Sequence, residues 1–428
     1  MTDITVNNNV PTGRLVMDDR KRFELRSALA TAFTPSAPVS RLDLFSGRRS
    51  QLERVTDVIF QRGQHAVIYG ERGVGKTSLA NVLAEWLDQL KRFNYQVVRH
   101  NCAATSNFNS IWEGVFRELS YKRHGTVGFL ENTTSVPMSA FVPPNAGSED
   151  VRFLLQQTGS STVVVIDEYD RVKDPATPGL LADTIKSLSD HAIDATLIVI
   201  GVADSIDELI AEHKSVERAL VQVQMPRMST QELLAIVDRG FQAADMEIQD
   251  DAKRHIAVLS QGLPHNAHEL GLLSGYSAID KDKTMANKSD VESAIKHAVD
   301  NAQQTIVTAY CDAISSSQSK NFYREILFAA ALAPTDELGY FAAGDLRRPL
   351  AVITHKSMGI DRYMRHLNSF CEESRAKILE KKGERRRYRF RFKESIMEPY
   401  VLMKGIADGL MDEEDVVALE SEQVSNPS

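Results

Sequence analysis

The stretch GERGVGKTS at residues 70–78 contains the residue types that hold phosphate groups. Gly70, Gly75, Lys76 and Thr77 fit the spacing G-x-x-x-x-G-K-[ST], with a short apolar strand before them and a helical pattern after them. Such glycines let backbone N–H groups curl around phosphate oxygens, and the start of the helix adds partial positive charge. We therefore expect Lys76 to reach the β- and γ-phosphates of a nucleotide and Thr77 to coordinate Mg²⁺. The alternative is a glycine-rich turn without a ligand.

A second pattern, VVVIDEYD at residues 163–170, places two acids directly after four β-branched residues. These acids, Asp167 and Glu168, therefore stand at the carboxyl end of a buried parallel strand, where doubly wound sheets bind their ligands. Asp167 is placed to hold Mg²⁺, directly or through water, and Glu168 is placed to polarise an attacking water molecule. In the alternative interpretation, Glu168 only caps the next segment.

The elements that must position these motifs alternate regularly between strand and helix. Short apolar stretches predict strands at residues 65–70, 95–101, 161–170, 195–205 and 221–226. Helical patterns with apolar residues three and four apart fall before, between and after them. This alternation predicts an α/β fold with a doubly wound parallel sheet. Residues 121–150, rich in Gly, Thr, Ser and Pro, interrupt the pattern and are expected to form an insertion or long loop.

Beyond the predicted sheet the pattern becomes helical. Capping boxes are predicted at Ser229 with Glu232 and at Ser289 with Glu292, which indicates a small all-helical domain. A serine-rich linker follows, and then the order helix, helix, helix, hairpin, which is typical of a winged helix-turn-helix. The predicted domains are an irregular leader (1–40), a nucleotide-binding core (41–227), a helical lid (228–305), a winged-helix domain (318–410) and an acidic tail (411–428).

Composition limits the possible classes of protein. The chain has 428 residues, 43% of them hydrophobic, without a signal peptide or an apolar run that could cross a membrane. Its three scattered cysteines suggest neither a disulfide framework nor a metal site, and together these features predict a cytoplasmic protein. Six acids and no Lys or Arg follow Leu410, so most of the net charge of −8 comes from a tail that is expected to be disordered.

The phosphate-binding motif GERGVGKTS and the acidic motif VVVIDEYD, together with the strand TLIVIGVADS, resemble the corresponding motifs of AAA+ ATPases. Within this class, the chain resembles the origin-initiator (Orc/Cdc-type) branch. The resemblance covers residues 42–410. It implies that Asp204 positions the hydrolytic water, or else is only a turn residue. It also implies that Arg218 reaches the γ-phosphate of a neighbouring subunit, unless it only favours a helix C-terminus.

The lid departs from that family. Where an Orc/Cdc-type lid carries an arginine directed at the γ-phosphate, this chain has His265, and a histidine side chain reaches less far than an arginine. Slow, switch-like turnover is therefore expected. His265 and His268 alone are a weak metal-binding pattern. The predicted nucleotide contacts are Gly70, Glu71, Arg72, Gly73, Val74, Gly75, Lys76, Thr77, Ser78, Asp167 and His265.

Near the C-terminus, arginines alternate with aromatic residues along one predicted strand. Tyr388, Phe390 and Phe392 should face the core, and the arginines the opposite side. With Lys381 and Lys382, the arginines are interpreted as contacts to the phosphate backbone of DNA, or else as an internal clamp on the acidic tail or the ATPase core. The candidate DNA contacts are Arg362, Arg365, Arg385, Arg386, Arg387, Arg389 and Arg391.

The sequence thus predicts a Mg²⁺-dependent ATPase that hydrolyses ATP slowly to ADP and phosphate. Its winged-helix domain would act on duplex DNA or a DNA-bound partner. A homo-oligomer is expected, and a separate effector chain is possible. One rival is a STAND-type signalling ATPase, which oligomerises with ATP and uses its winged helix as a clamp. Another is a transposition-helper ATPase that forms filaments on DNA.

Overall fold

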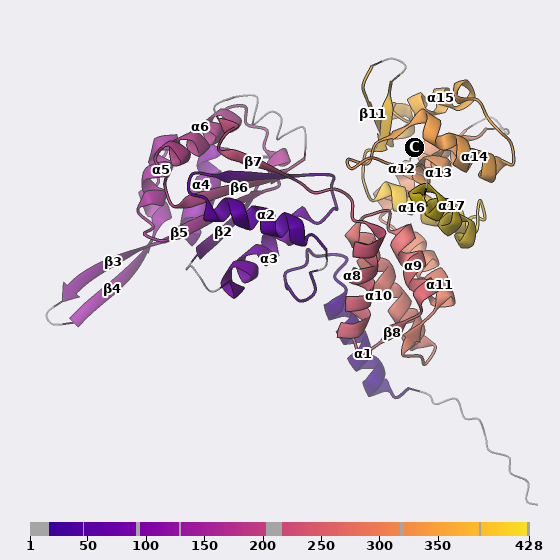
Figure 1. The fold of residues 1–428 in the computed structure, drawn as a ribbon, viewed down its shortest axis with the longest axis horizontal. Helices are drawn as coiled ribbons and strands as arrows, with labels where there is room; N and C mark the ends of the chain where they lie inside the picture. The colour runs from indigo at the N-terminus through magenta and orange to yellow at the C-terminus, as the bar shows by residue number, and fades with distance from the viewer. Residues whose placement is uncertain are drawn as a thin grey trace, which may run out of the picture.

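A five-stranded parallel sheet forms the centre of the nucleotide-binding core in the computed structural model (Figure 1). The structure describes residues 17–45, 47–90, 95–127, 130–202, 216–316, 321–384 and 387–425. The strand order is β2-β5-β6-β1-β7, and every neighbouring pair is parallel. The strands are β1 (His65–Tyr69), β2 (Tyr95–Asn101), β5 (Ser161–Asp167), β6 (Ala195–Gly201) and β7 (Leu220–Gln224).

Helices cover both faces of this sheet, as the buried valines of β5 require. Val163 and Val165 pack with one set of helices, and Val164 and Ile166 with the other. The first set is α2 (Arg49–Phe60) and α3 (Lys76–Gln89), and the second is α4 (Phe108–Glu118), α5 (Ser148–Gln156) and α6 (Thr177–Asp190). The expected doubly wound sheet is therefore confirmed.

The insertion differs from the expected loop. Strands β3 (Ser120–Val127) and β4 (Leu130–Pro137) pair as an antiparallel hairpin that projects from the core in Figure 1. A short 3₁₀ helix, η1 (Met138–Phe141), follows and leads toward α5. Polar residues in these strands hid the hairpin from a reading based on apolar runs.

The leader is also different from the expectation, because residues 19–32 form helix α1 (Asp19–Ala32). Asp18 caps the helix by accepting a hydrogen bond from the Lys21 N–H. Its apolar side, with Leu25 and Leu29, packs into the hydrophobic core of the lid. The helix therefore belongs structurally to the lid, although it precedes the sheet in sequence.

The lid consists of α8 (Thr230–Ala243), α9 (Asp250–Leu259), α10 (Pro264–Asp280) and α11 (Lys288–Asp300), with a small β8–β9 pair (Glu247–Ile248 and Met285–Ala286) at its end. The capping box of Ser229 with Glu232 is confirmed. The second predicted box is wrong by two positions, because Asn287 and Asp290 form it at the start of α11. Asn287 is as good a cap as serine, so the sequence allowed either start.

The C-terminal domain has the winged-helix order after the connecting helix α12 (Gln304–Ile314). Its elements are α13 (Tyr323–Ala331), β10 (Phe341–Ala342), η4 (Ala343–Leu346), α14 (Arg347–Thr354), α15 (Ile360–Ser369), η5 (Glu373–Arg375), β11 (Leu379–Lys382), β12 (Arg389–Phe392) and α16 (Met397–Ala407). Strands β10, β12 and β11 form one sheet, whose strand β10 was not predicted. The expected winged helix is thus confirmed, and Phe390 and Phe392 are buried as predicted. His366 of α15 is buried against Tyr323.

The acidic tail forms helix α17 (Glu413–Ser425), which corrects the expectation of disorder. Val416 and Leu419, three residues apart, are buried on the lid side, and Glu413 contacts His255 of α9 at 3.0 Å. The apolar pair was hidden among charges in the sequence. Among the described residues, no helix is both long and apolar enough to span a bilayer.

Candidate nucleotide-binding site

The loop between β1 and α3 has the backbone geometry of a phosphate-binding loop. Gly70 lies so close to β7 that a Cβ atom on it would be 2.3 Å from the Met225 carbonyl oxygen. Gly75 has φ of +95°, a left-handed conformation that glycine adopts without strain. Val74 is buried, and its carbonyl accepts a hydrogen bond from Arg48 at 3.4 Å. The glycine positions in the motif are therefore required by the fold of the loop.

A cavity of about 570 Å³ opens beside this loop, large enough for a nucleotide. The P-loop and the ends of β5 and β6 form one side of the cavity, and Pro264, His265 and His268 of the lid form another. The rest of the wall comes from residues 34–39, between α1 and α2, a segment that the sequence predicts to be part of an irregular leader. This segment has no charged residue and no recognisable motif, so its place at the cavity is known only from the fold.

Lys76 points back at its own loop. Its Nζ donates to the carbonyl oxygens of Gly70 at 2.9 Å and Glu71 at 2.8 Å. Burial lowers the pKa of Lys76 to about 8, although Asp170 and Asp167 nearby favour the charged form. A phosphate group in the cavity would offer this ammonium a stronger acceptor than the two carbonyls.

Thr77 and Asp167, the two predicted Mg²⁺ ligands, are brought together. The Thr77 hydroxyl donates to Asp167 Oδ2 at 3.0 Å, while Asp167 Oδ1 accepts from the Glu168 N–H at 2.7 Å. Asp167 is 2% exposed, at the carboxyl end of β5. A hydroxyl and a carboxylate at the edge of a phosphate site are the oxygen donors that Mg²⁺ takes in such sites, so these residues fit the ion.

Arg99 also contacts Asp167, which the sequence alone does not predict. It projects from β2, and its Nη2 donates to Asp167 Oδ2 at 2.7 Å while its Nη1 donates to Asn81 Oδ1 on α3. An arginine in the middle of a predicted strand carries no motif signal. The parallel register of β2 and β5 is what brings it to this carboxylate.

Glu168, the predicted water-polarising acid, has an unusual backbone conformation. Its φ is +56°, in the left-handed region that non-glycine residues seldom adopt and that occurs often at active sites. Its carboxylate accepts from Arg171 at 2.8 Å. Glu168, Asp170 and Arg171 all line the cavity, and Arg72 of the P-loop pairs with Asp170 at 3.2 Å.

The remaining predicted site residues lie in different places. His265 lines the cavity and donates from Nδ1 to the Pro35 carbonyl at 2.6 Å. His268 accepts from the Thr34 N–H at 3.3 Å, and burial lowers its pKa to about 4. Among the described residues, no group of three His, Cys, Asp or Glu side chains could hold a metal ion.

The family resemblance supplied two further residues, Arg218 and Asp204. Arg218 is exposed in the turn before β7 and is not among the residues that line the cavity. Asp204 falls outside the described residues. The roles assigned to both therefore stay predictions.

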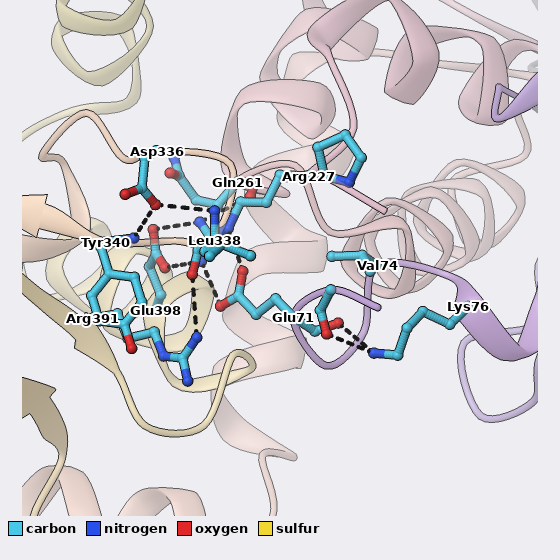
Figure 2. Close-up of polar contacts among 12 residues, drawn as sticks. Glu71, Val74, Lys76, Arg227, Gln261, Asp336, Leu338, Tyr340, Arg391 and Glu398 are labelled. Carbon is cyan, nitrogen blue, oxygen red and sulfur yellow. Dashed lines mark hydrogen bonds and ion pairs between the residues drawn. The ribbon is translucent and has the colours of Figure 1, made fainter. Parts of the chain in front are cut away.

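A buried charge cluster joins the P-loop to the winged-helix domain (Figure 2). Arg227, between β7 and α8, binds the carboxylate of Glu71 with Nε at 2.7 Å and Nη2 at 2.9 Å. It also binds Glu398 of α16 with Nη1 at 2.9 Å and Nη2 at 2.6 Å. The three side chains are 10%, 6% and 1% exposed, for Arg227, Glu71 and Glu398 respectively. Burial disfavours the charge on Arg227, but the two carboxylates outweigh this effect and raise its pKa.

Neighbouring residues extend this contact. Arg72 lies 3.9 Å from Glu394, and Gly73 lies close to Ser395. Gly339, in the turn before β10, lies against the Glu71 and Arg227 side chains. Three successive P-loop residues thus meet the winged-helix domain directly, through residues of that domain that the sequence does not single out.

Two of the candidate DNA contacts, Arg389 and Arg391, already have partners within the winged-helix domain. Arg391 pairs with Glu380 and lies over the Tyr340 ring at 4.6 Å, and Arg389 lies 3.6 Å from Asp336. Arg387, Arg362 and Arg365 are exposed, while Arg385 and Arg386 fall outside the described residues. As Figure 2 shows, Arg391 approaches the same turn that covers the charge cluster.

Comparisons with known proteins agree with this geometry. Residues 60–210 match the family model described as "AAA domain". The expected resemblance to AAA+ ATPases is therefore confirmed. A comparison with curated proteins gave no significant match.

Solved structures of the expected Orc/Cdc type are among those similar to the chain. The ORC1 protein of Aeropyrum pernix, in complex with DNA, is 15% identical with a TM-score of 0.47, over 92% of this chain and 98% of that chain. Cdc6p of Pyrobaculum aerophilum is 16% identical with a TM-score of 0.44, over 89% and 99%. A Walker-type ATPase of Pyrococcus abyssi is 15% identical with a TM-score of 0.48, over 86% and 98%. At such identities, function has to be argued from this chain's own residues.

Proposed function

We propose that the protein is a switch that binds ATP with Mg²⁺ and hydrolyses it slowly. The observation that carries this proposal is the meeting of Lys76, Thr77 and Asp167 in one cavity beside a P-loop with the required glycine conformations. Lys76 would leave its loop carbonyls for the phosphates, and Glu168 would orient and polarise the attacking water. Mg²⁺ held at Thr77 and Asp167 would neutralise charge that develops on the phosphates.

We further propose that the winged-helix domain conveys the state of the switch to DNA or to a DNA-bound partner. Exposed Arg362 and Arg365 on α15 and Arg387 beside β12 offer cations on the elements that such domains use for phosphate contacts. Because the domain also contacts the P-loop through Arg227, a change at the phosphate site has a short physical route to it.

The test is the ATPase rate of the purified chain with and without duplex DNA, at low and at moderate salt. We expect DNA to stimulate the rate and salt to weaken the stimulation, because phosphate contacts release counterions. A rate that DNA leaves unchanged at every salt concentration contradicts the DNA-linked proposal but not ATP binding itself.

A second candidate, a STAND-type signalling ATPase with the winged helix as an internal clamp, is favoured by one observation. Glu394 of the winged-helix domain already lies 3.9 Å from Arg72 of the P-loop, and Glu398 binds Arg227, which also binds Glu71 of the P-loop. Arg389 and Arg391 likewise already contact groups inside their own domain. In this alternative ATP would release the clamp and allow oligomerisation. Oligomerisation with ATP in light scattering, combined with an ATPase rate that DNA leaves unchanged, would favour this second candidate.

Two further parts of the proposal come from the sequence. We propose that Arg218, exposed before β7, reaches the nucleotide of a neighbouring copy, so that assembly controls hydrolysis. A cytoplasmic location and a separate effector chain also stay predictions.

A further inference from the structure

Asp167 already has a cationic partner inside the protein. Its Oδ2 atom accepts hydrogen bonds from two donors, the Thr77 hydroxyl at 3.0 Å and the Arg99 guanidinium at 2.7 Å. Thr77 and Asp167 are also the residues that fit Mg²⁺. One carboxylate oxygen therefore lies next to both the expected metal position and a permanent positive charge, because arginine does not lose its proton in proteins.

Arg99 is held in this position by more than its charge. It leaves β2 on the side that faces α3, where Asn81 accepts from its second terminal nitrogen. The side chain is 26% exposed, and its Nε is buried without a hydrogen-bond partner among the described residues. An arginine at the surface would keep Nε in water, so this geometry indicates that the contact to Asp167 outweighs the loss of that hydration.

Asn81 also connects this network to the cavity wall. Its Nδ2 donates to the Val39 carbonyl at 3.4 Å, and Val39 belongs to the segment that lines the nucleotide cavity. Arg99 thus bridges Asp167, at the carboxyl end of β5, and Asn81 of α3. Helix α3 also carries the P-loop lysine, and through Asn81 it holds the segment that lines the cavity. Its position is fixed relative to the phosphate site.

The positive charge of Arg99 should favour the binding of nucleotide phosphates and disfavour the binding of Mg²⁺. Without a counter-charge, the Asp167 carboxylate repels the phosphates of a nucleotide that arrives without metal. With Arg99 beside it, this repulsion is largely cancelled. The same guanidinium repels a divalent cation that approaches Asp167 and occupies a lone pair of the oxygen that would face it.

We infer that Arg99 is a positioning residue that acts as a built-in counter-charge for Asp167 and lets the site hold nucleotide with only weak dependence on Mg²⁺. This inference rests on the proposed ATP site. It concerns the metal requirement of binding, so it can fail while ATP binding itself stands. A protein of this kind would keep its nucleotide when the ion leaves, which suits a switch that turns over slowly.

The experiment measures the Kd of a fluorescent ATP analogue by anisotropy, once with excess Mg²⁺ and once with EDTA, on the full chain. The quantity of interest is the ratio of the Kd in EDTA to the Kd in Mg²⁺. Arg99→Gln removes the charge, and Arg99→Lys keeps it. Arg62→Gln is the matched control, because Arg62 pairs with Asp194 in an exposed contact outside the cavity lining.

We expect the ratio to rise by about tenfold or more in Arg99→Gln, because both electrostatic effects of a charge a few ångströms away act in the same direction. Arg99→Lys and Arg62→Gln should stay within about threefold of the wild-type ratio. A structural role alone would weaken both Kd values equally and leave the ratio unchanged, which overturns the inference. A ratio that falls also overturns it, since Arg99 would then be needed to hold Asp167 for the metal. If the wild-type chain binds no nucleotide even with Mg²⁺, the proposed function fails instead.

Discussion

Removal of Arg227 should detach the winged-helix domain from the P-loop. In Arg227→Met the carboxylates of Glu71 and Glu398, which are 6% and 1% exposed, would lose the guanidinium that binds each of them through two hydrogen bonds. Removal of one partner from a buried ion pair typically costs about 3–5 kcal/mol, because the remaining charge stays dehydrated. Release of the domain hydrates Glu398, so this cost should appear as a shift of the docking equilibrium toward the undocked state.

The assay is hydrogen exchange of the backbone amides in α16 and in the turn before β10, both of which lie at the contact. A change of about 3 kcal/mol corresponds to faster exchange by roughly two orders of magnitude for amides whose exchange rate is set by the opening equilibrium. Arg62→Met is the control, since exposed pairs such as Arg62–Asp194 contribute little.

A neutral version of the cluster gives the sharpest check of this reasoning. Replacement of all three charges, as in Glu71→Gln, Arg227→Met and Glu398→Gln together, leaves no buried ion and should restore much of the protection. If these amides exchange as slowly in Arg227→Met as in the wild type, the reasoning is refuted. So would equally fast exchange in the single and triple variants, because charge would then not be what holds the domain.

Three other predictions concern the nucleotide and the wing. Since burial lowers the pKa of Lys76 to about 8 from its ordinary 10.5, the lysine of the empty site loses its charge as the pH rises past 8. ATP affinity should therefore fall as the pH rises above 8, and a pH titration of the Kd that stays flat from pH 8 to pH 10 would contradict this. Glu168→Gln should bind ATP like the wild type but hydrolyse it at least about 100-fold more slowly, whereas normal turnover in a phosphate-release assay would move the base elsewhere. Joint neutralisation of Arg387, Arg389 and Arg391 should weaken DNA binding and reduce the salt slope by up to about three charges, and an unchanged slope would remove the wing from the interface.

The sequence predicted those parts of the fold that have a regular hydrophobic pattern or a motif with few possible conformations. Strands such as β5, with four β-branched residues in a row, can only be buried, and the glycines around Lys76 leave few alternatives to a P-loop. From these strands and loops the positions of Lys76, Thr77, Asp167 and Glu168 follow, because the carboxyl ends of parallel strands meet at one edge of the sheet.

What the sequence did not predict depends on contacts between distant segments. Arg99 reaches Asp167 only through the register of β2 and β5, and residues 34–39 reach the cavity only because α1 packs on the lid. Glu71, Arg227 and Glu398 come from three separate regions, and no local pattern pairs Glu71 of the P-loop with either of the other two. The helix of the acidic tail was missed for a related reason, since two buried apolar residues outweigh a charged composition once the lid surface is present.

The central claim, that this cavity binds ATP through its P-loop, is tested most directly by calorimetric titration of ATP with Mg²⁺ into the wild-type chain and into Lys76→Ala. We predict saturable binding by the wild type and its loss in the variant, because Lys76 supplies the cation at the phosphates. Equal affinity of the two proteins, or no binding by either, would contradict the account.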